Sequence, residues 1–171
     1  EAICRKNGIL LVADEVITAF GRTGAWTGSR LWGVKPDFTC TAKAITNAYF
    51  PFGAVMIAES VAEVFERDES GKAAIGHGYT YSGHPVGAAA ALACLAETQR
   101  LNVKDNAAER GAELHTGLLA LQAKHEAIGD VRGGHGLMCA IELVADRATK
   151  KAADKAIPGK VQAVAYQAGA M

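Results

Sequence analysis

The stretch ILLVAD, residues 9–14, decides the fold class. It is a short, continuous apolar run that ends in an acid, which is typical of a strand buried on both faces of a parallel sheet. Three further apolar runs of strand length follow it: FTCT (38–41), FGAVMIA (52–58) and LMCAIELV (137–144). The polar, glycine-rich stretch between the first two runs predicts a loop with one helical turn.

Helical patterns alternate with these runs. Residues 60–67 predict a helix capped by Ser60, with Glu63 at the spacing of a capping box. Pro85 falls in the first turn of the next predicted helix. Strands that alternate with helices indicate an α/β layer architecture.

The longest helical pattern runs from residue 103 to about residue 124, because apolar residues recur there at helical spacing (Ala107, Leu114, Leu118 and Leu121). We expect this helix to bridge two domains, residues 1–102 and residues 103–171. The first residues, EAICRKNG, read as the last turns of a helix that ends at Gly8, and the last, VQAVAYQAGAM, stop in or just after a helical pattern. We therefore expect the chain to be part of a longer protein.

Composition narrows the function classes. The 18 Lys and Arg residues are balanced by 18 Asp and Glu residues, so the chain lacks the positive charge that nucleic-acid binding requires. It has neither an apolar run of membrane-spanning length nor a signal-peptide pattern, which predicts a soluble protein without a membrane partner. The four cysteines lie far apart, without the spacing of a zinc site or a disulfide framework, and this favours reduced thiols in a cytoplasmic protein (Cys4, Cys40, Cys94 and Cys139).

Several weak motifs do not predict a site. GGHGLM (133–138) lacks the third glycine of a dinucleotide-binding fingerprint and is followed by a strand, so we interpret it as a glycine-rich turn. SGK (70–72) lacks the upstream glycine of a phosphate-binding loop. His77 and His84 have no carboxylate at ligand spacing, so we expect no metal site.

Asp14 and Lys43 form the one pair that points to chemistry. Each comes at the end of a predicted strand, and the carboxyl ends of strands form the ligand crevice of open α/β sheets. An acid and an amine delivered there could make a structural salt bridge. They are also what pyridoxal phosphate (PLP) requires, since it needs a lysine amine for its Schiff base and a carboxylate against its pyridine nitrogen. The residues by themselves leave both interpretations open.

Three segments in order carry a family resemblance: LLVADEVITAFGRTG (10–24), GVKPDFTCTAKAITNAYFPFGAV (33–55) and HGYTYSGHPVGAAAALA (77–93). Together they resemble the class III PLP-dependent aminotransferases, and within these the omega-amino-acid or amine:pyruvate transaminases. The resemblance covers essentially the whole chain. It implies an α/β fold-type-I PLP-dependent transferase, with residues 1–102 as the C-terminal part of the large mixed-sheet domain that binds PLP. Residues 103–171 would be the bridging helix and the start of a small C-terminal α+β domain.

The resemblance also implies a role for five residues. Lys43 would be the Schiff-base lysine, Asp14 the partner of the pyridinium nitrogen, and Val16 would pack against one face of the ring. Thr80 would bind the cofactor phosphate of the neighbouring subunit, which implies a homodimer. Tyr79 would contribute through its backbone only.

The implied reaction is the transfer of an amino group from an amine or omega-amino acid to a keto acid, with pyruvate as the expected acceptor, by a ping-pong mechanism. An aminomutase, a racemase or a decarboxylase would use the same Asp14 and Lys43, and a truncated, non-catalytic chain is a further alternative. Family members carry other cofactor and substrate residues outside the region that this chain matches, so we expect the chain alone to be inactive. Ala44 stands where many members have glycine, and its methyl group is tolerated if the backbone φ is negative.

Other residues of these segments have alternative explanations. Loop bracing or subunit contacts explain Glu15, Arg22 and Thr23 as well as a catalytic role does. Trp26 and Tyr81 could line a substrate channel, although core packing is the more frequent role of such rings.

Overall fold

The computed structural model describes residues 1–170. Contacts within the chain divide it into two compact units, Glu1–Ala108 and Glu109–Met171. The boundary lies inside α5 (Val103–Lys124), the helix that the apolar spacing predicts.

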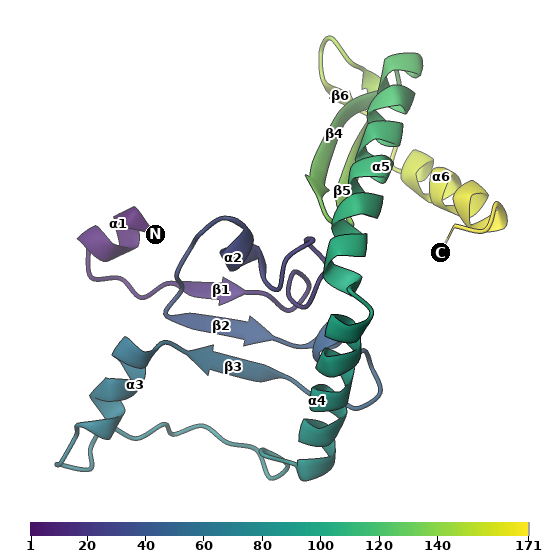
Figure 1. Cartoon of the computed structure of the whole chain (residues 1–171). Helices are drawn as coiled ribbons and strands as arrows, with labels where there is room; N and C mark the ends of the chain where they lie inside the picture. The colour runs from purple at the N-terminus through teal and green to yellow at the C-terminus, as the bar shows by residue number, and fades with distance from the viewer. Residues whose placement is uncertain (171) are drawn as a thin grey trace. The chain divides into compact units, whose positions relative to one another are not determined.

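The first unit contains a three-stranded sheet of order β1-β2-β3 (Figure 1). β1 (Val12–Asp14) pairs in parallel with β2 (Phe38–Thr41), and β3 (Ala54–Ile57) pairs antiparallel with β2. All three strands lie within runs that the sequence predicts. Because β1 and β2 are parallel, their carboxyl ends lie at the same end of the sheet.

Short helices connect these strands. α2 (Gly28–Leu31) is the single helical turn expected between β1 and β2, and the Thr27 hydroxyl caps it by accepting from the Arg30 N–H at 3.1 Å. A 3-10 turn, η1 (Lys43–Ile45), follows β2, and α4 (Pro85–Arg100) begins at the predicted proline.

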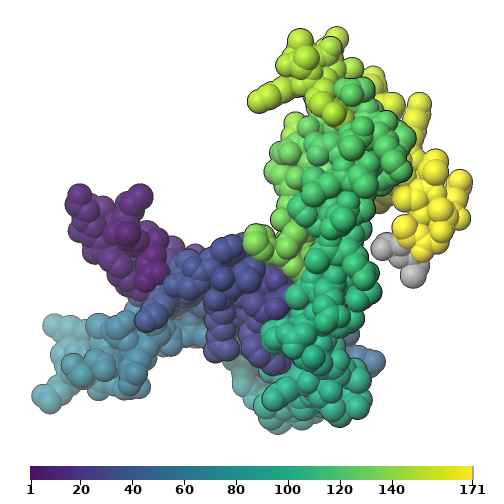
Figure 2. Space-filling view, turned by 45° about the horizontal axis from the view of Figure 1, so that its top comes forward, coloured from purple at the N-terminus to yellow at the C-terminus, as the bar shows by residue number. Residues whose placement is uncertain are grey.

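α1 and α3 flank the sheet. α1 (Ala2–Lys6) ends before Gly8, whose φ of 62° is typical of a residue that ends a helix. α3 (Glu59–Glu66) follows β3, and the predicted Ser60 cap is wrong: its N-cap is Ala58, and Ser60 already lies inside the first turn. Both helices project from the sheet (Figures 1 and 2).

The predicted burial of the strands on both faces is also wrong for this chain. Val12 is 57% exposed and Val55 is 58% exposed. The reason is that the main contacts between elements within residues 1–108 join strand to strand and α4 to η1, so no described helix packs extensively on the sheet. The apolar runs therefore predict the strands correctly but not their surroundings.

A buried acid fixes the start of β2. Asp37 is 2% exposed and accepts hydrogen bonds from the Arg5 guanidinium and from the Leu11 N–H, both at 2.7 Å. The hydrogen bond from Arg5 and then that from Leu11 lower the pKa of Asp37. This carboxylate therefore joins α1 to the residues that lead directly into β1 and β2.

The second unit combines the C-terminal part of α5 with an antiparallel sheet of order β4-β5-β6 and a final helix. Its elements are β4 (Ile128–His135), β5 (Met138–Asp146), β6 (Lys151–Ala152) and α6 (Ala156–Gln167). The glycine-rich turn predicted at 133–138 is wrong for its first residues, because Gly133 and Gly134 belong to β4. They have φ of 126° and 85°, and the register with β5 shifts beside them, so the glycines accommodate a strand irregularity.

Glycines also bring α5 close to this sheet. A Cβ on Gly111 would lie 1.9 Å from the Gly136 carbonyl oxygen, and the ring of His115 lies against Gly134. The Gln122 side-chain amide donates to the Gly129 carbonyl at 3.1 Å. The face of α5 that packs on the sheet therefore includes positions 111, 115 and 122, whereas the predicted apolar positions Leu114 and Leu121 are exposed.

Candidate active site

Asp14 and Lys43 both lie at the end of the sheet where β1 and β2 end. Asp14 is the last residue of β1 and lies opposite Cys40 of β2, and Lys43 follows three residues later. Both side chains are exposed. One Asp14 oxygen accepts a hydrogen bond from the Val16 N–H at 3.0 Å, which fixes the turn that leaves β1.

The two charged groups do not neutralise each other. Within residues 1–170, no ion pair or hydrogen bond joins the Asp14 carboxylate to the Lys43 amine, and the amine has no other such partner. The structure therefore does not contain the structural salt bridge that the sequence alone leaves open. An acid and an amine remain accessible at one end of the sheet.

The backbone around Lys43 is strained. Lys43, Asn47 and Ala48 have φ of 47°, 49° and 65°, in the left-handed region that residues other than glycine rarely adopt. Each such residue costs on the order of 1–3 kcal/mol, least for asparagine. Ala44 is not among the described residues with positive φ, so its methyl group is accommodated as expected.

Hydrogen bonds within the loop hold this conformation. The Asn47 N–H donates to the Lys43 carbonyl at 2.9 Å, and the Thr46 hydroxyl donates to the Phe50 carbonyl at 2.6 Å. Ile45 and Thr46 are buried, with 6% and 2% of their surfaces exposed. The loop thus buries the side chains of Ile45 and Thr46, while the Lys43 side chain stays exposed to solvent.

Helix α4 supports the same loop. The Cys94 thiol lies 3.6 Å from the Ala44 carbonyl oxygen as a weak donor. A Cβ on Gly87 would lie 2.8 Å from the Phe52 ring and 3.0 Å from the Phe50 ring, so glycine allows α4 to approach. The sequence shows α4 but gives no signal that it packs on the loop of Lys43.

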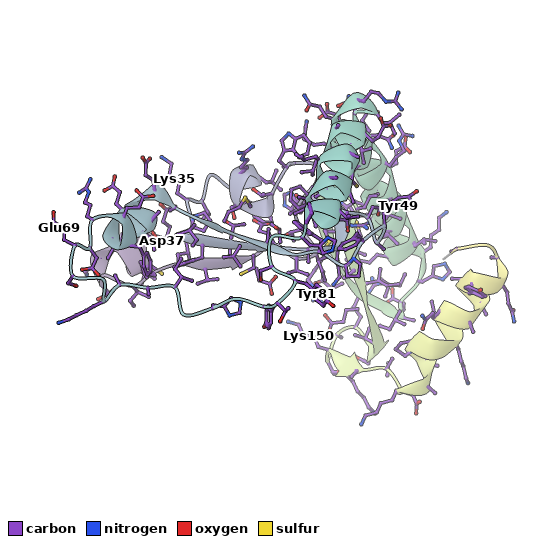
Figure 3. The ribbon with its side chains drawn as sticks, turned by 90° about the horizontal axis from the view of Figure 1, so that it is seen from below. Lys35, Asp37, Tyr49, Glu69, Tyr81 and Lys150 are labelled. Carbon is purple, nitrogen blue, oxygen red and sulfur yellow. The ribbon has the colours of Figure 1, made fainter. Side chains whose placement is uncertain are left out.

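The segment that contains Tyr79 and Thr80 reaches the same end of the sheet. The His84 ring lies 5.3 Å from the Phe50 ring, centroid to centroid, just before α4 begins. Figure 3 places Tyr49 and Tyr81 at this end, and Lys35 and Asp37 at the other. The Tyr79 N–H donates to the Ser82 hydroxyl at 2.9 Å, and the side chains of Tyr79 and Thr80 are exposed.

Glu15 turns out to brace the loop after β1. Its carboxylate is 3% exposed and accepts from the Gly28 N–H at 2.8 Å, from the Ser29 N–H at 2.6 Å, from the Ser29 hydroxyl at 2.5 Å and from the Thr18 hydroxyl. Burial alone would raise the pKa of Glu15, but the hydrogen bonds from Ser29, Thr18 and Gly28 outweigh it and lower the pKa. Of the explanations that the sequence offers for Glu15, this chain shows loop bracing.

A cavity of about 410 Å³ in the first unit does not include either member of the pair. Trp26, considered above for a substrate channel, is one of its walls. The lining residues are Phe20, Trp26, Thr27, Ser29, Arg30, Val34, Lys35, Pro36, Thr39 and Met56. Among residues 1–170 there is no cluster of three or more potential metal ligands, and no helix is long and apolar enough to cross a bilayer.

Comparison with known proteins identifies the family. The family model for aminotransferase class-III matches residues 1–168. The chain belongs to this family. It is 46% identical over 154 residues to an uncharacterized aminotransferase, y4uB, of Sinorhizobium fredii, a match that covers 90% of this chain and 33% of the relative.

Two relatives have names that state a reaction. The diaminobutyrate–2-oxoglutarate transaminase of Halomonas elongata is 43% identical over 157 residues, covering 92% of this chain and 33% of the relative. The taurine–pyruvate aminotransferase of Bilophila wadsworthia is 39% identical over 170 residues, covering 99% and 37%. The chain therefore spans about a third of the length of the curated relatives it matches.

Solved structures have the same fold. An amine transaminase from an uncultivated Pseudomonas species, in its PLP-bound form, has a TM-score of 0.93 and 44% identity over 99% of this chain and 38% of its own. A transaminase obtained by ancestral reconstruction has a TM-score of 0.91 and 41% identity, covering 99% and 37%. The arrangement of strands and helices is thus that of class III PLP-dependent transaminases, as the sequence predicts.

Proposed function

We propose that this chain is the lysine-bearing part of a PLP-dependent aminotransferase that moves an amino group from an amine or omega-amino acid to a keto acid. One observation carries the proposal: in a member of the class III family, Asp14 and Lys43 lie unpaired at the carboxyl ends of adjacent parallel strands. The name of the taurine–pyruvate relative supports pyruvate as the acceptor.

The residues present fit PLP. The cofactor needs an amine, a carboxylate and a phosphate site, and the first two are the pair at the end of β1 and β2. The Lys43 amine is not engaged by any described residue, and only one oxygen of Asp14 has a hydrogen bond, from Val16. Thr80 lies shortly before Pro85, where α4 begins, and a helix start is suited to a phosphate group.

Each residue then has a physical task. When bound, PLP supplies an electron sink for the charge that develops at the substrate Cα. The Asp14 carboxylate keeps the pyridine nitrogen protonated, because a nearby opposite charge favours the charged form. Val16 packs its branched side chain against the ring and excludes water from that face.

Lys43 has two tasks, which share one amine. It would hold the cofactor, and as a general base it would take the proton from the substrate Cα and then deliver it to the C4′ carbon of the cofactor. For both, its amine must reach the cofactor and the substrate in turn. The strained loop of residues 43–48 fixes where the lysine side chain begins.

The assembly that we propose is a cytoplasmic homodimer in which the Thr80 hydroxyl and the Tyr79 backbone bind the phosphate in the neighbouring subunit. The exposure of Tyr79 and Thr80 supports this proposal, since both are available to a second chain. The cytoplasmic location rests on the scattered, unpaired cysteines.

The decisive experiment is to locate the cofactor lysine in the intact protein. After addition of PLP and reduction with borohydride, peptide mass spectrometry should find the adduct on Lys43. Lys43→Arg should lose the adduct and lower amino transfer to pyruvate by at least about 10²–10⁴-fold. Lys35→Arg, a change of another exposed lysine of the same unit, should alter neither.

An adduct on a different lysine, or transfer that survives Lys43→Arg, would refute the assignment. Formation of alanine from pyruvate supports the proposed acceptor. A decarboxylated, racemised or rearranged product in place of alanine would instead point to another reaction of the same cofactor.

A further inference from the structure

We propose that Thr46 is a positioning residue for Lys43. Its buried hydroxyl locks the loop of residues 42–50 in the strained conformation from which the Lys43 amine reaches the cofactor. This inference rests on the proposed function, because it assigns a second residue to the same site.

Strain is concentrated in this loop. Of the six non-glycine residues with positive φ among residues 1–170, three lie between positions 43 and 48. Such backbone persists only where the surrounding structure holds it in place. Lys43 itself is one of the three, so the strain bears directly on the direction in which its side chain leaves the backbone.

The hydrogen bond of Thr46 spans the other two strained residues. Its hydroxyl donates to the Phe50 carbonyl at 2.6 Å, across Asn47 and Ala48, and its side chain is 2% exposed. Its own N–H and that of Asn47 donate to the Lys43 carbonyl at 3.3 Å and 2.9 Å. A continuous set of bonds therefore connects the threonine hydroxyl to the backbone of Lys43.

Without this hydroxyl the loop can relax. Asn47 and Ala48 would return to right-handed or extended backbone, which is favourable for residues with a Cβ. The Lys43 carbonyl would then lose its partners, and the lysine would relax to negative φ, which redirects its Cα–Cβ bond. The residue would still be present, but its amine would start from a different place.

The test uses two substitutions in the intact protein. Thr46→Val keeps the size and branching and removes the hydroxyl, whereas Thr46→Ser keeps the hydroxyl and removes a methyl group. We expect Thr46→Val to lower kcat for amino transfer roughly ten- to hundredfold with little change in the KM for the amine, since misplacement by about 1 Å has effects of this size. Thr46→Ser should stay within about threefold of wild type on the same basis.

A second readout needs neither cofactor nor activity. The rate at which an amine-specific reagent labels Lys43 is measured by peptide mass spectrometry in the cofactor-free protein, with Lys35 in the same sample as the internal standard. Thr46→Val should change the labelling rate of Lys43 relative to Lys35, and Thr46→Ser should not. If the two variants change kcat and the urea midpoint alike, with Lys43 labelled as in wild type, Thr46 is only structural and the inference is wrong.

Ala48→Gly provides a rescue. Glycine adopts positive φ without strain, so in the Thr46→Val background it removes one reason for the loop to relax. We expect the double variant to lie between Thr46→Val and wild type, both in kcat and in the labelling of Lys43 relative to Lys35. If Thr46→Val does not fold, the double variant is compared with Ala48→Gly alone, which keeps the hydroxyl. Equal kcat and equal labelling of Lys43 in these two variants would overturn the proposal.

Failure of this inference is distinct from failure of the proposed function. If the wild-type protein forms no borohydride-fixed adduct at Lys43, the proposed function is wrong whatever Thr46 does. If the adduct forms and Thr46→Val matches wild type in kcat and labelling, only the role of Thr46 is wrong.

Discussion

At the scale of single residues, neighbouring acids have opposite surroundings. Asp14 is exposed and keeps one oxygen without a hydrogen bond among the described residues, whereas Glu15 is buried beneath four donors. Successive side chains of an extended backbone point to opposite sides, so Asp14 and Glu15 face different surroundings. Asp14 is available for chemistry, and Glu15 holds the loop that follows it.

We predict that Glu15 stabilises the fold in a pH-dependent way. Its pKa is lowered from 4.5 in the folded chain, so the unfolded chain binds more protons as the pH falls. The stabilisation is present above about pH 4.5 and is lost as the pH falls through the lower, folded-state pKa. Glu15→Gln should lower the free energy of unfolding at pH 7 by about 2 kcal/mol, because a glutamine presents one oxygen where the loop needs two.

Urea unfolding at a series of pH values checks this prediction. Glu15→Gln should also lose stability less steeply than wild type as the pH falls below about 4.5, because it lacks the carboxylate whose pKa is lowered by folding. Glu69→Gln, which changes an exposed glutamate of the same unit, is the control and should match wild type. Equal midpoints for Glu15→Gln and wild type at pH 7 would show that the loop does not depend on this carboxylate.

At the scale of elements, local patterns predict the strands β1, β2, β3 and β5 and the helices α4 and α5. Apolar runs and helical spacing are properties of a few adjacent residues, and the structure confirms them. β4 is different, because Gly133 and Gly134 remove the apolar signature and the strand exists through its pairing with β5. The left-handed backbone of Lys43 could not be predicted either, since it depends on hydrogen bonds and on packing against α4.

The face of α5 that packs on its sheet gives a prediction with a matched control. In a helix, alanine is normally more stable than glycine by up to about 1 kcal/mol. Gly111→Ala should instead destabilise the protein by about 1–3 kcal/mol, because its methyl group would lie 1.9 Å from the Gly136 carbonyl oxygen. Gly117→Ala, in the same helix with nothing within 4 Å of the new methyl group, should raise stability.

Thermal and urea unfolding of the two variants measure the difference. We expect the same glycine-to-alanine change to lower the free energy of unfolding at position 111 and to raise it at position 117. The comparison therefore separates the effect of packing from that of helix propensity. If Gly111→Ala were as stabilising as Gly117→Ala, the close approach of α5 to the β4–β5 connection would be wrong.

At the scale of the whole molecule, the accessible surface of the chain is larger than that expected for two separate compact domains of the same lengths. Its accessible surface is 12181 Å², whereas two separate compact bodies of these lengths would together expose roughly 9,600 Å² by the usual scaling of surface with mass. Many large apolar side chains are exposed, among them Val12, Val55 and Leu92. Apolar surface of this extent favours contact with further polypeptide, such as the second subunit that we propose.

The proposed exchange of Thr80 between subunits predicts how mixed dimers behave. A Lys43→Ala subunit has no cofactor lysine, and a Thr80→Ala subunit lacks the proposed phosphate ligand. If Thr80 serves the neighbouring site, a mixed dimer has one site with both defects and one with none. Subunits of the intact protein that are denatured together and refolded at equal amounts should then recover about a quarter of the wild-type sites, since half of the dimers are mixed.

If Thr80 serves the site of its own subunit instead, the activity recovered by refolding is different. The segment of Thr80 reaches the end of the sheet where Lys43 lies in the same chain, through the contact of the rings of His84 and Phe50. If Thr80 served that site, every site of the mixed dimer would carry a defect, and refolding would yield no more activity than the two variants contribute separately. Activity at saturating PLP, measured against wild type that was refolded in parallel, distinguishes the two arrangements because only exchange between subunits rebuilds an intact site.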